Sequence, residues 1–143
     1  IKYWKRFKRK DYTHKNTECD FIMNYAVCAT ASNIDAKAII AYTNTGSTAK
    51  MVSSFGPGCP VFAITQNKIT YRQLGLCWGI IPKLFEPQEN IDILLHKGIE
   101  KLIKEEFLVK GDKVVIAGGT KVLTDVPDNE LEKNNVMGGI VEI

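Results

Sequence analysis

Residues 37–54 read KAIIAYTNTGSTAKMVSS, and this stretch predicts a buried strand, a polar turn and a helix in direct succession. The short apolar run at 38–41 is bounded by polar residues, as in strands that are covered on both faces of a parallel sheet. A strand followed at once by a helix places the unpaired N–H groups of the helix amino terminus at the end of the strand. Such a position suits the docking of an anionic group.

The polar turn in this stretch supplies side chains that can cap a helix or hydrogen-bond an anion, and its glycine allows a tight turn or close approach to a ligand. The turn consists of Thr43, Asn44, Thr45, Gly46, Ser47 and Thr48. It contains neither the GxGxxG of dinucleotide-binding folds nor the GxxxxGK[ST] of P-loop proteins. Two interpretations stand side by side: a phosphate-binding turn, or an ordinary strand-to-helix turn capped by Thr45 or Ser47.

Length and composition are those of one soluble domain. A chain of 143 residues can bury a core of its own, so residues 1–143 are expected to form a single domain. No apolar stretch approaches the 18 residues of a membrane span, and the basic start IKYWKRFKRK is not followed by the apolar core of a signal peptide. We expect a cytoplasmic protein with no membrane partner.

The cysteines and the basic start do not follow the patterns of metal or nucleic-acid sites. The spacing of the four cysteines matches no zinc motif and favours buried, reduced thiols at Cys19, Cys28, Cys59 and Cys77. Six positive charges fall within the first ten residues, but Ile1, Trp4 and Phe7 recur among them as on an amphipathic helix. We expect this segment to lie on a partner or on its own domain, with no nucleic acid bound.

Strand and helix patterns alternate along the chain. The predicted strands lie at 36–42, 61–65, 80–85, 114–117 and 140–143. The predicted helices run over 18–32, from the polar turn to about 55, over 67–76 and from 90 onward. Asn67 and Asn90 are expected to cap the last two, and residues 120–137 form a long polar connection. This alternation predicts a mostly parallel sheet with helices on both faces and function at the carboxyl ends of the strands.

Two polar segments follow the carboxyl ends of predicted strands. Residues 43–48 follow the first strand, and residues 118–121 follow the fourth. If the two strands are neighbours in the sheet, the two segments form one pocket.

Several blocks resemble the carboxyl-terminal domain of pyruvate kinase. The stretch KAIIAYTNTGSTAKMVSSFGPGCPVFAITQNKITYRQLGLCWGIIPKLF is similar to that family's Thr-x-x-Gly-x-[Ser/Thr]-Ala turn, its strand ending in Thr, its Thr-x-Arg-Gln-Leu helix and its Trp-Gly-[Ile/Val]-x-Pro strand, in the same order. Further on, VKGDKVVIAGG and IVEI resemble the family's Lys-Gly-Asp turn, next strand and closing strand. The likeness is weak before residue 35 and over 120–137.

The resemblance implies an αβα sandwich with a five-stranded, mostly parallel sheet whose last strand is antiparallel. It also implies a domain that packs against a catalytic barrel, binds a phosphorylated metabolite and assembles into a homotetramer, here through the first helices and the last strand. Phosphoryl transfer from phosphoenolpyruvate to ADP, with magnesium and potassium, belongs to the barrel. We therefore expect no catalytic residue, metal or cofactor in this chain alone.

The effector residues implied by the resemblance are the turn residues and the start of the loop after the fourth strand. They are Thr43, Asn44, Thr45, Gly46, Ser47, Thr48, Gly118, Gly119, Thr120 and Lys121. Members regulated by fructose bisphosphate carry basic residues where Asn44 and Ser47 stand, and a Trp/Arg insertion that the link at 86–90 lacks. A monophosphate such as a pentose phosphate or AMP is therefore expected in place of fructose 1,6-bisphosphate.

Other functions remain open at this point. The domain could be a purely structural dimerisation module that pairs through its first helix and residues 139–143. It could also be a stand-alone protein that binds phosphorylated metabolites. An independent enzyme is disfavoured because His14 and His96 lack an evident acid partner and no GxSxG is present.

Overall fold

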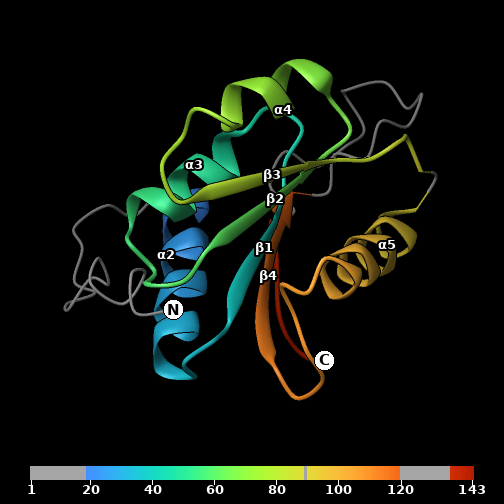
Figure 1. Ribbon diagram of the computed structural model, residues 1–143. Coiled ribbons are helices and arrows are strands. Elements are labelled where there is room, and N and C mark those ends of the chain that lie inside the picture. Colours follow the sequence, from blue (N-terminus) through green and yellow to red (C-terminus); the bar gives the residue numbers. More distant parts are fainter. Residues whose placement is uncertain (1–18, 89, 120–135) are drawn as a thin grey trace.

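The computed structural model of this chain describes residues 19–88, 90–119 and 136–143 (Figure 1). Its centre is a five-stranded sheet in the order β3-β2-β1-β4-β5. The strands are β1 (Ala38–Tyr42), β2 (Val61–Thr65), β3 (Ile80–Leu84), β4 (Lys113–Gly119) and β5 (Val136–Glu142). The first four are parallel, and β5 runs antiparallel to β4. The predicted mostly parallel sheet with an antiparallel last strand is confirmed.

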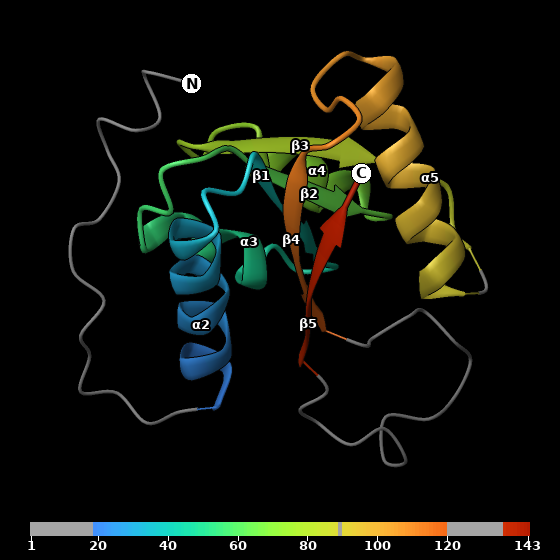
Figure 2. The same cartoon turned by 90° about the horizontal axis from the view of Figure 1, so that it is seen from below.

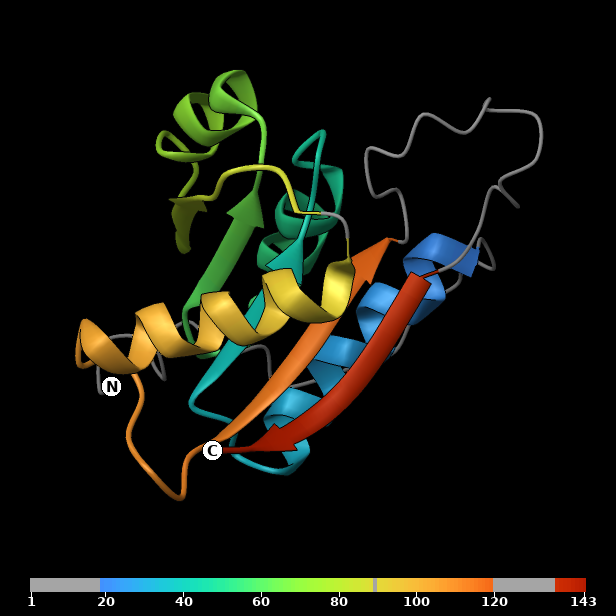
Figure 3. The same ribbon diagram turned by 90° about the vertical axis from the view of Figure 1, so that its right-hand side faces the viewer.

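Helices cover both faces of the sheet. Three of them pack on one face: α2 (Cys19–Asn33), α3 (Ser47–Ser54) and α4 (Lys68–Leu74). The opposite face is covered by α5 (Ile91–Lys104). Figures 2 and 3 show α2 and α5 on opposite sides of the strands. This is the predicted three-layer sandwich.

The central strands are apolar throughout because each of them contributes to two cores. All five residues of β1 and of β2 are buried. Successive side chains of a strand point to opposite faces, so Ile39 packs in the core under α2 and α3 while Ile40 packs in the core under α5. A strand of this kind has no polar face, which explains why the sequence shows a continuous apolar run and no alternation.

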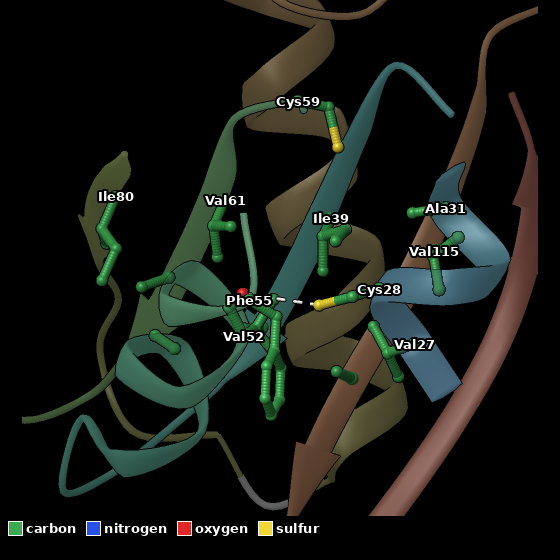
Figure 4. Close-up of a cluster of buried hydrophobic side chains, with 14 of the residues drawn as sticks. Val27, Cys28, Ala31, Ile39, Val52, Phe55, Cys59, Val61, Ile80 and Val115 are labelled. Atoms are coloured by element: carbon green, nitrogen blue, oxygen red, sulfur yellow. Dashed lines mark hydrogen bonds between the residues drawn. The ribbon is translucent and has the colours of Figure 1, made fainter. Parts of the chain in front are cut away.

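The core under α2 and α3 joins side chains from helices and strands that are far apart in the sequence (Figure 4). The ring of Phe55 packs edge-on against Phe21, with 5.0 Å between ring centroids, and against Tyr25 at 5.5 Å. The buried thiol of Cys28 donates to the carbonyl of Val52 at 3.4 Å. Cys28, Cys59 and Cys77 are free thiols, as predicted; Cys28 and Cys59 are also buried as predicted, whereas Cys77 is only half-buried.

Both predicted asparagine caps are present. The side chain of Asn67 accepts from the N–H groups of Ile69 and Thr70 at 2.8 and 3.3 Å, and Asn90 accepts from Asp92 N–H at 2.9 Å. These bonds satisfy N–H groups that have no partner inside the helix.

The side of α4 that packs on the sheet is not the one that the spacing of its side chains favours. Spacing favours Ile69, Gln73 and Leu76 as the inner side, but Ile69 and Leu76 are strongly exposed and the buried residues are Thr70 and Leu74. The reason is a bond that no local pattern contains. Thr70 Oγ1 donates to the carbonyl of Asn44 at 2.6 Å, which fixes the helix against the turn after β1.

The amphipathic first helix predicted around Ile1, Trp4 and Phe7, and most of the polar connection at 120–137, lie outside the described residues. Within the part of the chain that the structure describes, no helix combines the length and apolarity that a bilayer crossing requires.

Candidate functional site

The turn between β1 and α3 is organised by its backbone and by one buried threonine. Gly46 occupies the position before the first residue of α3 with φ 88°, a left-handed conformation that favours glycine. Its N–H donates to Thr43 Oγ1 at 2.7 Å, and Thr43 N–H donates to the carbonyl of Ile64 at 3.1 Å. The N-cap residue of α3 is Gly46, which has no side chain to cap the helix, and Ser47 is already the first helical residue. Thr43 is buried and supports the turn from inside.

The outer side of the turn carries exposed hydroxyl groups. Thr45 Oγ1 donates to Ser47 Oγ at 3.1 Å, and Ser47 N–H reaches Thr45 Oγ1 at 3.4 Å, near the limit for a hydrogen bond. The first intrahelical bond runs from Lys50 N–H to the carbonyl of Gly46. No acceptor among the described residues takes the N–H groups of Thr48 and Ala49. The helix terminus therefore retains donors that an anion can use.

The strand that carries this turn lies beside the strand that carries the second predicted segment. In the parallel register of β1 and β4, Tyr42 pairs with Gly118. The condition that the two strands are neighbours is met. Gly118 and Gly119 are not loop residues, however, because they continue β4 and pair with Met137 and Val136 of β5.

Two further predicted site residues, Thr120 and Lys121, lie outside the described residues. The described part of the predicted effector site is therefore the turn itself, with the end of β4 beside it. Asn44 and Thr48 are half-buried at its sides, while Thr45 and Ser47 face outward.

Two residues near the turn are not singled out by the sequence. Thr70 holds the carbonyl of Asn44, as described above. Tyr42, the last residue of β1, is 7% exposed, and its hydroxyl has no hydrogen-bond partner among the described residues. Burial, and to a smaller degree the charge of Asp92, raises the pKa of this phenol above its ordinary value. Strand alternation assigns Tyr42 to the core but carries no information on its hydroxyl.

A recess lies at the other end of the strands, where β2 begins. It is lined by residues 56–59, Val61, Gly79 and the exposed Trp78, and Ser53 Oγ donates to the Trp78 carbonyl at 2.8 Å beside it. Ser53 carries the only hydroxyl among its lining residues, and this hydroxyl already donates to the Trp78 carbonyl. This recess does not suit a phosphate, which leaves the turn as the stronger candidate.

His14 lies outside the described residues, and neither His96 nor the neighbouring serines of α3 belong to a catalytic grouping among the described residues. His96 is exposed on α5, and the hydroxyls of Ser53 and Ser54 donate to backbone carbonyls. Across residues 19–88, 90–119 and 136–143, no three His, Cys, Asp or Glu side chains are grouped as a metal site requires.

Comparison with known proteins gives one consistent result. Residues 23–129 match the family model described as pyruvate kinase, alpha/beta domain. The chain is 35% identical over 116 residues to a pyruvate kinase of Sporosarcina psychrophila, covering 81% of this chain and 20% of that protein. It is 33% identical over 130 residues to a pyruvate kinase of Clostridium acetobutylicum, covering 91% and 26%. The chain thus spans about a fifth to a quarter of the length of these relatives.

The solved structures agree with respect to fold. The crystal structure of a pyruvate kinase from Cryptosporidium parvum superimposes with a TM-score of 0.74 at 19% identity, over 91% of this chain and 24% of that chain.

Proposed function

Because the chain belongs to the pyruvate kinase family, whose α/β domain it matches, we propose that it is the effector-binding and subunit-assembly domain of a pyruvate kinase. Phosphoryl transfer from phosphoenolpyruvate to ADP, with magnesium and potassium, then takes place in a catalytic barrel outside this domain. The domain packs against that barrel in a cytoplasmic homotetramer, and a phosphorylated metabolite bound here regulates the reaction.

One observation carries the effector role: the amino terminus of α3 presents donors at the carboxyl end of a central strand. The N–H groups of Thr48 and Ala49 have no acceptor within the described structure, and the hydroxyls of Thr45 and Ser47 are exposed beside them. Amides and neutral hydroxyls stabilise an anion without a counter-charge. Since Asn44 and Ser47 add no positive charge, the proposed ligand carries a single phosphate.

Regulation requires that the ligand bind one arrangement of the whole enzyme better than another. Differential affinity of this kind is typically worth about 1 to 3 kcal/mol. In this proposal the isolated domain binds the ligand, and only the full enzyme converts binding into a change of activity.

A thermal-shift experiment tests the effector role. The chain is heated with ribose 5-phosphate, AMP, glucose 6-phosphate, fructose 1,6-bisphosphate or inorganic phosphate. A ligand at 100 times its Kd adds about 2.7 kcal/mol of stability, which raises Tm by roughly 5 to 10 °C in a chain of this size. We expect such a rise with a monophosphate.

The matched variants are Ser47→Asp and Ser54→Asp, which place a carboxylate at either end of the same eight-residue helix. Ser47→Asp should abolish the shift by occupying the anion position, whereas Ser54→Asp should retain it. A flat response of the wild-type chain to every phosphate, or an equal loss in both variants, contradicts the effector role.

The exposed edge of the sheet favours the assembly role. Within the described sheet, β5 pairs with β4 alone, and no described strand takes the backbone groups on its outer side. Ile140 on β5 is 56% exposed, and Ile22 and Met23 on the adjacent α2 are also exposed. Figure 2 shows β5 at this edge, with α2 on one side of it. A two-fold axis at this edge would bury these side chains.

Sedimentation velocity of Ile140→Lys tests this role, with Glu142→Lys as a control because both residues are exposed on β5. We expect the wild-type chain and the Glu142 variant to dimerise with rising concentration and the Ile140 variant to remain monomeric. A wild-type chain that is monomeric at all concentrations rules out self-assembly of this domain through β5.

A further inference from the structure

The connection between α4 and β3 presents two large apolar side chains to solvent. Leu76 is 91% exposed and Trp78 is 53% exposed. Trp78 also lines the recess at the start of β2, together with residues 56–59. We call Leu76, Trp78 and residues 56–59 the Trp78 surface. Single exposed apolar side chains are common in soluble proteins, so the composition around them decides whether this surface has a use.

The segments that form the Trp78 surface carry no charge. Residues 51–67 and 73–82 contain no Asp, Glu, Lys, Arg or His, although charged residues make up 24% of the chain. Burial explains this absence in β2 but not in the connection 75–79, most of which is exposed. The cores of protein interfaces are depleted in charge and enriched in tryptophan. The Trp78 surface has this composition.

Hydrogen bonds hold the backbone of the Trp78 surface in place. Ser53 Oγ donates to the Trp78 carbonyl at 2.8 Å. The N–H of Val61 donates to the Gly79 carbonyl at 3.1 Å. The connection is therefore ordered in the domain by itself, so a partner that docks here has little backbone to order on binding.

The edge of the sheet beside this surface does not suit the addition of another strand. β3 and β5 are the two edges of the sheet, as Figure 2 shows. The Gly79 carbonyl and the Phe85 N–H both bond to β2. Because successive residues of a strand direct their backbone groups to alternate sides, Pro82 faces away from β2. A proline there lacks the N–H that a further strand requires, so a partner on this side is bound through side chains.

The partner is expected in the same polypeptide. The chain spans about a fifth to a quarter of the length of the related pyruvate kinases. In an enzyme of that length the remainder is covalently attached, which gives it a high effective concentration at this surface. A second copy of the domain has the opposite edge, at β5, for strand pairing.

We propose that the Trp78 surface is the site on which the catalytic barrel of the same polypeptide docks. This inference rests on the proposed function and adds the surface that meets the barrel. The Trp78 surface lies where β2 and β3 begin, whereas the turn at 43–48 follows the end of β1. The barrel and a phosphorylated metabolite would therefore bind at opposite ends of the sheet.

A photo-cross-linking experiment in a full-length enzyme tests this docking. In the pyruvate kinase of Sporosarcina psychrophila, the segment that matches this chain is replaced by this chain. The photoreactive residue p-benzoylphenylalanine then replaces Leu76 or, as the control, Ile93, which is 46% exposed on α5. We expect illumination to join position 76 to a barrel peptide of the same polypeptide, identified by mass spectrometry, and position 93 to give no such product.

The variant Leu76→Ser gives a second measurement that does not depend on cross-linking. Because Leu76 is almost fully exposed in this chain, the substitution should leave the urea midpoint of the isolated chain unchanged. In the chimeric enzyme it should lower Tm, since the apolar contact with the barrel is lost. The control Ile93→Ser should change neither value.

The results separate this inference from the proposed function. A chimera that does not fold or has no pyruvate kinase activity contradicts the proposed function, and this inference fails with it. An active chimera in which position 76 cross-links to nothing, or to a second copy of the domain, overturns the docking alone. The docking is also overturned if Leu76→Ser and Ile93→Ser change the Tm of an active chimera equally.

Discussion

Gly118 of β4 lies directly opposite Tyr42 of β1, and a Cβ at position 118 would come within 2.7 Å of the Cβ of Tyr42. Real Cβ atoms essentially never approach so closely. The two strands therefore meet closely at the end of the sheet that carries the turn at 43–48, and glycine permits this contact. Because the obstructing atom is close to the backbone of β1, it cannot move aside as the tip of a long side chain can.

Replacing Gly118 with alanine should destabilise the protein by about 1 to 3 kcal/mol, the usual cost of overpacking a tight core position. Urea unfolding measures the change. Gly139→Ala on β5 is the control, since nothing lies within 4 Å of its would-be Cβ, and it should change stability by less than about 0.5 kcal/mol. Equal effects of the two substitutions would contradict the close contact.

Asn67→Ala should cost about 1 kcal/mol, because it removes the side-chain acceptor for two N–H groups at the start of α4. The free energy of unfolding in urea gives the value. Asn67→Asp preserves the acceptor and should recover most of the loss. Ser47→Ala at the start of α3 should cost less than Asn67→Ala, since the Ser47 hydroxyl accepts from the Thr45 hydroxyl and caps no N–H group of that helix.

The stability of the protein should depend more on the ring of Phe107 than on the ion pair between Lys83 and Glu105 beside it. The ring of Phe107 packs against Phe62, with 5.1 Å between ring centroids. Lys83 Nζ lies 5.0 Å from the centroid of the Phe107 ring and also pairs with the carboxylate of Glu105. Surface ion pairs contribute little, so Glu105→Gln should cost less than about 1 kcal/mol. Phe107→Ala should cost about 1 to 2 kcal/mol through lost burial and ring contacts. Thermal unfolding of both variants at low and high salt checks the order, and a larger loss in Glu105→Gln would reverse it.

Stability should fall in alkaline solution partly because of Tyr42. Burial raises the pKa of its phenol in the folded state, so above pH of about 10 the unfolded chain releases this proton while the folded chain retains it. The group then favours unfolding by up to about 1.4 kcal/mol per pH unit. Urea midpoints of the wild type and Tyr42→Phe at pH 8 and pH 11 measure the difference. The wild type should lose more stability than the variant, and parallel losses would show that Tyr42 ionises normally.

The strands of the sheet could be predicted from the sequence because each of them follows from a local pattern. The apolar runs that become β1 and β2 are too continuous for half-exposed strands, and β2 has the predicted bounds of 61–65. Asn67 and Asn90 cap their helices through bonds to residues two or three positions away, so their role is visible locally. The last two strands of the chain, β4 and β5, are longer than predicted because Gly118 and Gly119 gain their strand structure from pairing with β5.

The candidate site is only partly visible in the sequence. The turn at the end of β1 follows from the sequence, whereas its position beside β4 was only a condition that the structure meets. The comparisons confirm the family. The burial of Thr70 depends on a hydrogen bond between residues 26 positions apart. The left-handed Gly46 and the unpaired hydroxyl of Tyr42 depend on how three elements meet in space. Binding of an effector at the turn stays a prediction.

The reversed course of β5 has a practical consequence for binding assays. Ile143 is held by the turn before β4, through bonds to the backbone of Gly111 and Asp112 at 2.7 and 2.8 Å. It therefore lies at the end of the sheet where the parallel strands begin. Figure 3 shows the C label far from the upper ends of β1 and β4. A biotin tag attached after this residue would anchor the molecule to a sensor chip with the turn at 43–48 on the side away from the chip, open to dissolved ligands.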